Sequence, residues 1–262
     1  MNELSEKLET TISELKTANN ELQNEIEKKS EQEQMRREFI ANVSHELKTP
    51  IALIQGYAEG LKENINDDPE SRDFYCEVII DEASKMNRMV KNLLSLNQLE
   101  FGEGQVRFEH FDLSEVIGSV TASARIMFEQ KGVELRYSEP GEHIMAWADE
   151  YMIEEVLTNY ISNALNHAKS IDGGNPVIEI KTVVSEDTVR TSVFNTGEPI
   201  PEDEIDRIWN KFYKVDKART REYGGNGIGL SIVKAVMEAH NQAFGVRNYD
   251  NGVEFWFDLC IK

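Results

Sequence analysis

The stretch FIANVSHELKTPIALIQGYAEGL, residues 39–61, decides the fold of the first half of the chain. Its apolar side chains recur at alternating steps of three and four residues, at Ile40, Val43, Leu47, Pro50, Ile54, Tyr57 and Leu61. That spacing is typical of one face of an α-helix. His45 lies off this face, with Glu46 beside it and Thr49 one helical turn further along. The stretch therefore predicts a helix that buries one face and presents His45 on another.

A second apolar face follows the turn-forming residues 64–69 (NINDDP). Its main members are Tyr75, Ile79, Met86, Met89, Leu93 and Leu96. Two antiparallel helices of this length bury too little apolar surface alone, so each hairpin needs a partner. A homodimer in which two helical hairpins form a four-helix bundle meets this need. We place this domain at residues 34–101.

The first 33 residues carry a different repeat, with apolar positions and one asparagine at steps of four and three: Leu8, Ile12, Leu15, Asn19, Leu22 and Ile26. This spacing is the seam of a coiled coil, and Asn19 on the seam favours one register. A single solvated helix is the alternative, because three heptads are short for a coiled coil. We predict that residues 1–33 form a coiled-coil signalling helix ahead of the hairpin.

The second half, residues 102–262, alternates strand-like and helical patterns. The strand-like runs are 177–184, 188–194, 243–248 and 253–260, and the helical runs are 113–130, 149–169 and 228–240. This alternation predicts an α/β sandwich with one layer of sheet and one layer of helices.

The composition excludes several classes of protein. The 262 residues include 28 Lys and Arg against 48 Asp and Glu, a net charge of −20, which disfavours nucleic-acid binding because phosphates need clustered cations. No apolar run reaches the roughly 18–20 residues that span a bilayer, and no signal peptide is recognisable. Cys76 and Cys260 lie far apart, which excludes a disulfide scaffold or a zinc module. We expect a cytoplasmic protein, or the cytoplasmic part of a larger one.

Residues 39–61 closely resemble the phosphoacceptor box of the sensor histidine kinases of bacterial two-component systems. The resemblance implies that His45 is phosphorylated on Nε2, a role that suits the nucleophilic imidazole. It implies that Glu46 hydrogen-bonds the other ring nitrogen and takes up charge. Thr49 then matches the position that orients water when the response regulator is dephosphorylated.

Four segments of the second half resemble the ATP-binding motifs of the GHKL ATPase superfamily. They are EEVLTNYISNALNHA (154–168), VFNTGEPI (193–200), IWNKFYK (208–214) and GGNGIGL (224–230). The last segment opens a predicted helix, so its backbone N–H groups can face phosphate. The charged stretch between residues 212 and 224 is expected to form a lid over ATP.

The resemblance assigns nucleotide binding to Asn159, Asn163, Asn166, His167, Asn195, Gly197, Lys214, Gly225, Gly227, Gly229 and Leu230. Asn163 is also the expected ligand of Mg²⁺, which needs few protein oxygens when phosphates and water supply the rest. Two positions depart from the superfamily pattern. Asn195 stands where an aspartate usually accepts from the adenine amino group, and Asn166 stands where many members carry a lysine. Either the phosphate contact of that lysine is lost, or Lys169 or Arg219 supplies it.

The implied function is an ATP-dependent protein-histidine kinase that acts as a homodimer within a membrane-bound sensor. It passes the phosphoryl group from His45 to an aspartate of a separate response regulator, and it also dephosphorylates that regulator. One alternative is a degenerate kinase that binds ATP poorly and acts as a scaffold. Another is a GHKL ATPase of the chaperone or topoisomerase kind, which residues 39–61 argue against.

Overall fold

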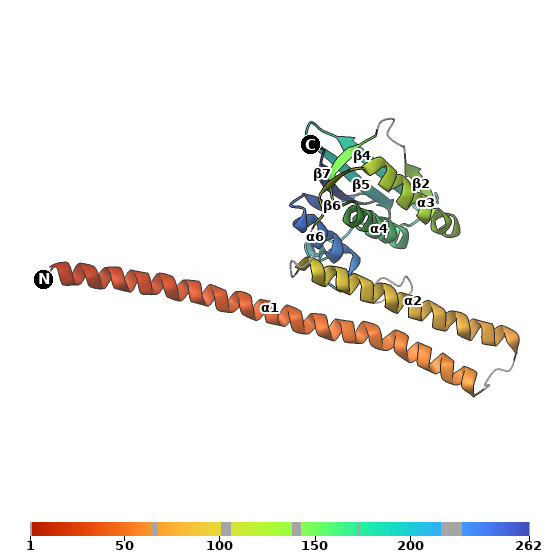
Figure 1. Ribbon diagram of the computed structural model, residues 1–262, viewed down its shortest axis with the longest axis horizontal. Helices are drawn as coiled ribbons and strands as arrows, with labels where there is room; N and C mark the ends of the chain where they lie inside the picture. Colours follow the sequence, from red (N-terminus) through yellow and green to blue (C-terminus); the bar gives the residue numbers. More distant parts are fainter. Residues whose placement is uncertain are drawn as a thin grey trace. The chain divides into compact units, whose positions relative to one another are not determined.

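The computed structural model describes residues 2–63, 68–100, 106–137, 143–171, 173–215 and 227–261 (Figure 1). The chain folds as two units, Met1–Ala83 and Ser84–Lys262, and the boundary between them falls inside a helix. Within the described residues, no helix is both long enough and apolar enough to cross a membrane.

The first unit is built from helix α1 (Asn2–Lys62) and the first part of helix α2 (Pro69–Glu100). The Asp68 carboxylate accepts from the Ser71 amide at 2.9 Å and so caps α2, which begins with Pro69 at its first position. The predicted helical hairpin is therefore present. The turn predicted at residues 64–69 lies largely outside the described residues, which omit 64–67.

Aromatic side chains hold the two helices of the first unit together. The ring of Tyr57 on α1 contacts Phe74 and Tyr75 on α2, with centroids 6.1 and 5.0 Å away. Gly60 allows this approach, because a Cβ there would lie 3.0 Å from the Tyr75 ring. The predicted seam position Tyr57 thus packs against the predicted second apolar face.

Helix α1 has no break between residues 33 and 34, and it continues through Pro50, which is buried. The apolar residues of the predicted coiled-coil seam stay exposed in the single chain: Leu8, Ile12, Leu15, Leu22 and Ile26. Among the described side chains, this row of exposed apolar residues is consistent with a surface that a partner covers, and the coiled coil stays a prediction.

The second unit contains a seven-stranded mixed sheet (Figure 1). Its strands are β1 (Glu109–Asp112), β2 (Glu134–Tyr137), β3 (Met145–Ala148), β4 (Val177–Val184), β5 (Thr188–Thr196), β6 (Phe244–Tyr249) and β7 (Gly252–Cys260). The order is β1-β3-β7-β5-β4-β2, and β6 also pairs with β7. Only the β2–β4 pair is parallel among the described strands.

Among the described residues that follow α2, three helices accompany the sheet: α3 (Leu113–Lys131), α4 (Glu150–His167) and α6 (Gly229–Ala239). Helix α4 packs against both α3 and α6 and lies over β5. Its Tyr160 ring contacts Phe255 and Phe257, so α4 covers the buried face of β7. A short 3-10 turn, η1 (Glu202–Glu204), follows β5. The predicted α/β sandwich is confirmed.

The sequence pattern missed three strands, β1, β2 and β3, which have four residues each. Strands this short complete barely two cycles of a two-residue repeat, and their pairing partners are distant in sequence. The predicted run 177–184 coincides with β4, whereas the runs predicted at 188–194, 243–248 and 253–260 differ from the observed strands by one or two residues.

Candidate functional site

The first candidate group lies on α1 and consists of His45, Glu46 and Thr49. His45 and Thr49 are exposed and Glu46 is half-buried. Pro50 lies inside α1 and has no amide proton. The usual helical hydrogen bond from residue 50 to the Glu46 carbonyl therefore cannot form. The His45 side chain is exposed, with a carboxylate next to it in sequence.

The second candidate group lies on one side of α4. Asp149 caps this helix by accepting from the Met152 amide at 3.2 Å. The opposite side of α4 is buried through Ile153, Val156, Leu157, Tyr160, Ile161, Ala164 and Leu165. This burial turns the polar stripe Glu155, Asn159, Asn163 and His167 away from the core.

The stripe residues differ in how their polar atoms are used. Asn159 donates from Nδ2 to the carbonyl of Glu155 at 2.9 Å. The Oδ1 atom of Asn159 takes no part in this hydrogen bond and lies next to Gly229. Within the described part of the chain, the amide of Asn163 makes no hydrogen bond and remains available to a ligand. Burial raises the pKa of Glu155, while loss of hydration and the charges of Lys169 and Lys131 lower the pKa of His167. The His167 ring is thereby favoured in its neutral form.

The start of α6 lies directly against this stripe. A Cβ built on Gly229 would lie 2.7 Å from Oδ1 of Asn159, closer than real Cβ contacts occur. Gly227 has φ +65°, and its carbonyl accepts from the amide of Phe212 at 2.7 Å. Position 229 requires glycine because the Asn159 side chain approaches its backbone closely. Position 227 requires glycine because its φ is positive. The segments 208–214 and 227–230 are therefore joined beside α4.

The end of β5 closes another side of the same site. Asn195 is buried and pairs in register with Ile178 on β4 and Val253 on β7. The backbone amide of Lys169 donates to the Thr196 carbonyl at 2.9 Å, so β5 is tied to the residues after α4. A Cβ on Gly197 would meet the carbonyl oxygen of His167 at 2.8 Å. The motif at 193–200 thus meets the C-terminal end of α4.

The aromatic residues of the segment 208–214 serve mainly to anchor it. The Trp209 ring packs edge-on against Phe244 on β6 and Phe255 on β7, with centroids 4.9 and 6.0 Å away. The Arg207 guanidinium lies 4.7 Å over the ring of Tyr213. Lys214, the predicted phosphate-binding cation, is half-buried in the same segment.

The donor set fits a magnesium nucleotide. One amide oxygen (Asn163) remains open, a glycine-bearing helix start faces Asn159, and a buried amide (Asn195) closes the sheet end. Backbone N–H groups at a helix N-terminus favour bound phosphate, and an amide oxygen is a suitable ligand for Mg²⁺. Gly225 and Arg219 lie outside the described residues, as does most of the predicted lid.

Both groups of residues fall within regions that match known families. Residues 35–102 match the His Kinase A (phospho-acceptor) domain, and residues 148–262 match the Histidine kinase-, DNA gyrase B-, and HSP90-like ATPase. Sensor histidine kinase WalK of Bacillus subtilis (strain 168) is 33% identical over 216 residues, which cover 82% of this chain and 35% of WalK. Sensor protein SrrB of Staphylococcus aureus (strain N315) is 32% identical over 216 residues, 82% of this chain and 36% of SrrB. The chain belongs to the sensor histidine kinases.

A solved histidine kinase is similar to this chain over most of its length. Histidine kinase ThkA, crystallised in complex with response regulator protein TrrA, matches with a TM-score of 0.66 and 28% identity over 86% of this chain and 61% of that chain. The predicted order of domains, a helical hairpin followed by a GHKL-type ATPase domain, is confirmed. This sensor histidine kinase chain spans about a third of the length of WalK and SrrB.

The structure of the kinase chain also contains contacts that the sequence motifs did not indicate. Lys131, in the last turn of α3, donates from Nζ to the Leu165 carbonyl and to Oδ1 of Asn166, each at 3.0 Å. Asn166 therefore contacts a lysine from another helix. Lys169, one of the two proposed replacements, pairs with Glu198 at 2.8 Å. The sequence feature that could have drawn attention to Lys131 is its place just before Gly132, which ends α3 in a left-handed conformation. A lysine near the C-terminal end of a helix is well placed to donate to backbone carbonyls.

Proposed function

We propose that this chain is the catalytic part of an ATP-dependent protein-histidine kinase that phosphorylates its own His45. The observation that carries the proposal is that one chain contains two sites, each within a region that matches a known family. One is an exposed histidine with a neighbouring carboxylate on a phosphoacceptor helix. The other is the open Asn163 amide beside the glycine-bearing start of α6 in an ATPase domain.

The proposed reaction needs a nucleophile and a group that stabilises the ring. The lone pair of His45 Nε2 forms a bond to the γ-phosphorus of ATP. The bond between that phosphorus and the bridging oxygen breaks, and ADP leaves with the electron pair. The Glu46 carboxylate accepts the proton of Nδ1 and so removes the charge that develops on the ring.

The proposed nucleotide site uses this chain's own polar stripe. Asn163 would hold Mg²⁺, which neutralises phosphate charge when bound. Asn159, His167 and Lys214 would contact phosphates, together with the backbone at Gly225, Gly227, Gly229 and Leu230. Asn195 and Gly197 would receive the adenine end. Lys131 brings a positive charge to Asn166, which supports a phosphate role at this end of α4 despite the missing lysine.

The proposed acceptor after His45 is an aspartate on a separate response regulator. Support comes from ThkA, whose crystal structure contains a response regulator protein. We also propose that the chain removes the phosphoryl group from that regulator, with Thr49 orienting the attacking water. Thr49 is exposed one turn beyond His45, so both residues face the same partner.

We propose that the chain works as a homodimer. Large apolar side chains of the first unit are exposed in the single chain on both helices, including Ile40, Ile51 and Leu53 on α1 and Phe74 and Ile80 on α2. A second copy of the hairpin would cover them as a four-helix bundle. The exposed seam at the start of α1 would form the coiled coil that carries the signal. In the complete protein this part would lie in the cytoplasm, below a membrane-bound sensor.

Labelling with γ-³²P ATP tests the kinase activity. The chain should incorporate label that is labile in acid and stable in base, and His45→Gln should remove it. His110→Gln serves as the matched control because His110 is also exposed but lies on β1. Label retained by His45→Gln would overturn the assignment.

Nucleotide binding is tested separately by calorimetry with Mg-ATP. Asn163→Ala should weaken binding more than threefold, because it removes the amide oxygen proposed for Mg²⁺. Ser162→Ala, at the exposed neighbouring position of α4, should bind as the parent does. A scaffold that binds ATP poorly is the competing function, suggested by Asn195 and Asn166. It would show neither label nor a difference between these variants.

A further inference from the structure

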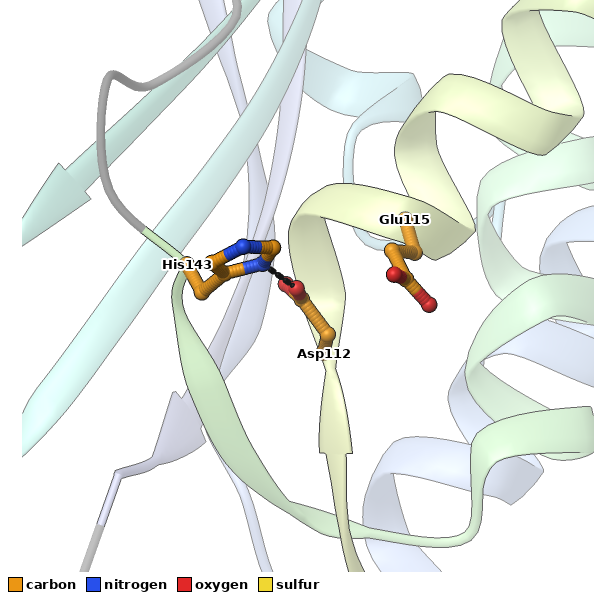
Figure 2. Close-up of side chains that lie close together, drawn as sticks. All are labelled: Asp112, Glu115 and His143. Carbon is orange, nitrogen blue, oxygen red and sulfur yellow. Dashed lines mark hydrogen bonds and ion pairs between the residues drawn. The ribbon is translucent and has the colours of Figure 1, made fainter.

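Three side chains that carry potential metal-ligand atoms lie together at the start of α3, and none of them belongs to the proposed nucleotide-binding set. The residues are Asp112, Glu115 and His143 (Figure 2). Each offers one ligand atom, and these atoms all lie within 4.8 Å of one another. Figure 2 shows the His143 ring facing the Asp112 carboxylate, with Glu115 extending beside them from the first turn of the helix.

The backbone holds the two segments of this cluster in register. Asp112 ends β1 and pairs with Met145 on β3. The amide of Leu113 donates to the Ile144 carbonyl at 2.9 Å, and the amide of Ile144 donates to the hydroxyl oxygen of Ser114 at 3.3 Å. His143 is therefore placed next to a hydrogen-bonded ladder.

Asp112 divides its carboxylate between two tasks. One oxygen, Oδ1, accepts from the Ser114 amide at 2.9 Å and caps α3. The other oxygen, Oδ2, faces Nδ1 of His143. The Asp112 side chain is 11% exposed and that of His143 is 79% exposed, so a largely buried carboxylate is paired with an exposed imidazole. Within the described residues, the Glu115 carboxylate makes no hydrogen bond or close salt bridge, while its charge acts on the His143 ring.

We propose that Asp112, Glu115 and His143 bind a divalent transition-metal ion of the Zn²⁺ type. Imidazole is a ligand that Zn²⁺ and its neighbours accept readily, whereas Mg²⁺ and Ca²⁺ prefer oxygen. Two carboxylates balance the charge of the ion, and water completes a tetrahedron around three protein ligands. The cluster is more than a group of acidic residues, because its nitrogen ligand comes from a separate segment of the chain.

The geometry requires a modest closure. Metal–ligand bonds of about 2.0–2.2 Å place tetrahedral ligand atoms roughly 3.4 Å apart. Atoms up to 4.8 Å apart must then approach by about 1.4 Å, whereas Nδ1 of His143 must separate from Oδ2 of Asp112, to which it is hydrogen-bonded. Rotation of the exposed Glu115 and His143 side chains can supply both changes. The bound ion would join the start of α3 to the residues that enter β3. It would brace the β1–β3 edge of the sheet, apart from the nucleotide chemistry.

Zn²⁺ titration of the full chain tests the proposal without measuring kinase activity. The chain, treated with chelator and free of nucleotide, carries ¹³Cε1-labelled histidine and is followed by NMR. His143→Gln assigns the His143 signal among the five histidines. We expect this signal to shift and saturate at one equivalent of Zn²⁺, while the signals of His110 and His240 stay in place. Millimolar Mg²⁺ should not produce the shift.

Matched variants separate a ligand set from a surface ion pair. Glu115→Gln should weaken Zn²⁺ binding at least tenfold, whereas Glu129→Gln, at the far end of α3, should not change it. Asp112→Asn should also weaken binding, and it keeps the helix capped because asparagine caps as well as aspartate does. The proposal is overturned if the His143 signal does not move. It is also overturned if Glu115→Gln and Glu129→Gln bind Zn²⁺ equally.

Discussion

Gly229→Ala should weaken Mg-ATP binding while leaving the fold intact. The new Cβ would lie 2.7 Å from Oδ1 and 3.4 Å from Cγ of Asn159. Ile228 and Ile232 are buried, so α6 cannot easily move back from the contact. The Asn159 carboxamide must therefore rotate, which breaks its 2.9 Å hydrogen bond to the Glu155 carbonyl.

The effects on stability and on binding differ in size. Alanine gains up to about 1 kcal/mol over glycine in a helix, and the broken hydrogen bond costs about 0.5–1.5 kcal/mol. The free energy of unfolding should then change by about 1 kcal/mol or less. Displacing Asn159 from a charged phosphate costs about 1.5–3 kcal/mol, or roughly tenfold to a hundredfold in affinity.

Calorimetry with Mg-ATP and urea unfolding of the same preparation measure both quantities. Gly118→Ala on α3 is the control, because a Cβ there has nothing within 4 Å. This control should keep its affinity and gain about 0.5–1 kcal/mol of stability. An affinity of Gly229→Ala within twofold of the parent would refute the reasoning, because Asn159 would then have no role in binding.

Three further predictions concern pH, assembly and the second activity. Burial lowers the pKa of the His240 ring, which accepts from the Asp149 amide at 3.0 Å and donates to the Val236 carbonyl at 2.8 Å. The stabilising effect of the neutral ring is fully present above the unfolded-state pKa of 6.5, and it is lost as the pH falls through the lower folded-state pKa. On acidification, His240→Gln should therefore lose less unfolding free energy than the parent. Equal losses for the two proteins would contradict this. Leu47→Asp should convert the dimer to a monomer by light scattering, because a buried charge would lack a partner, whereas Lys48→Ser at the exposed neighbouring position should remain dimeric. A parent chain that is monomeric at tens of micromolar would reject the bundle. Thr49→Ala should spare autophosphorylation and phosphotransfer but slow dephosphorylation of the regulator by roughly tenfold to a hundredfold, and a matched loss of all activities would show a merely structural role.

Local repeats in the sequence determined the helical half of this protein. The three-and-four spacing of residues 39–61 predicts a helix because side chains at those steps share one face. The structure has this helix within α1 and pairs it with α2 through Tyr57. The ATPase motifs were readable from their resemblance to the GHKL superfamily. The strand β4 was readable because its local apolar pattern is long enough to repeat.

Tertiary structure alone decided which distant residues meet. Asp112 and His143 are 31 positions apart, and β1 and β3, which bring them together, are too short to show a pattern. Lys131 on α3 hydrogen-bonds Asn166 on α4. Gly229 lies against Asn159 because α6 packs on α4. Pairing of short strands and packing of helices depend on burial summed over the whole sheet. No single stretch of sequence contains that information.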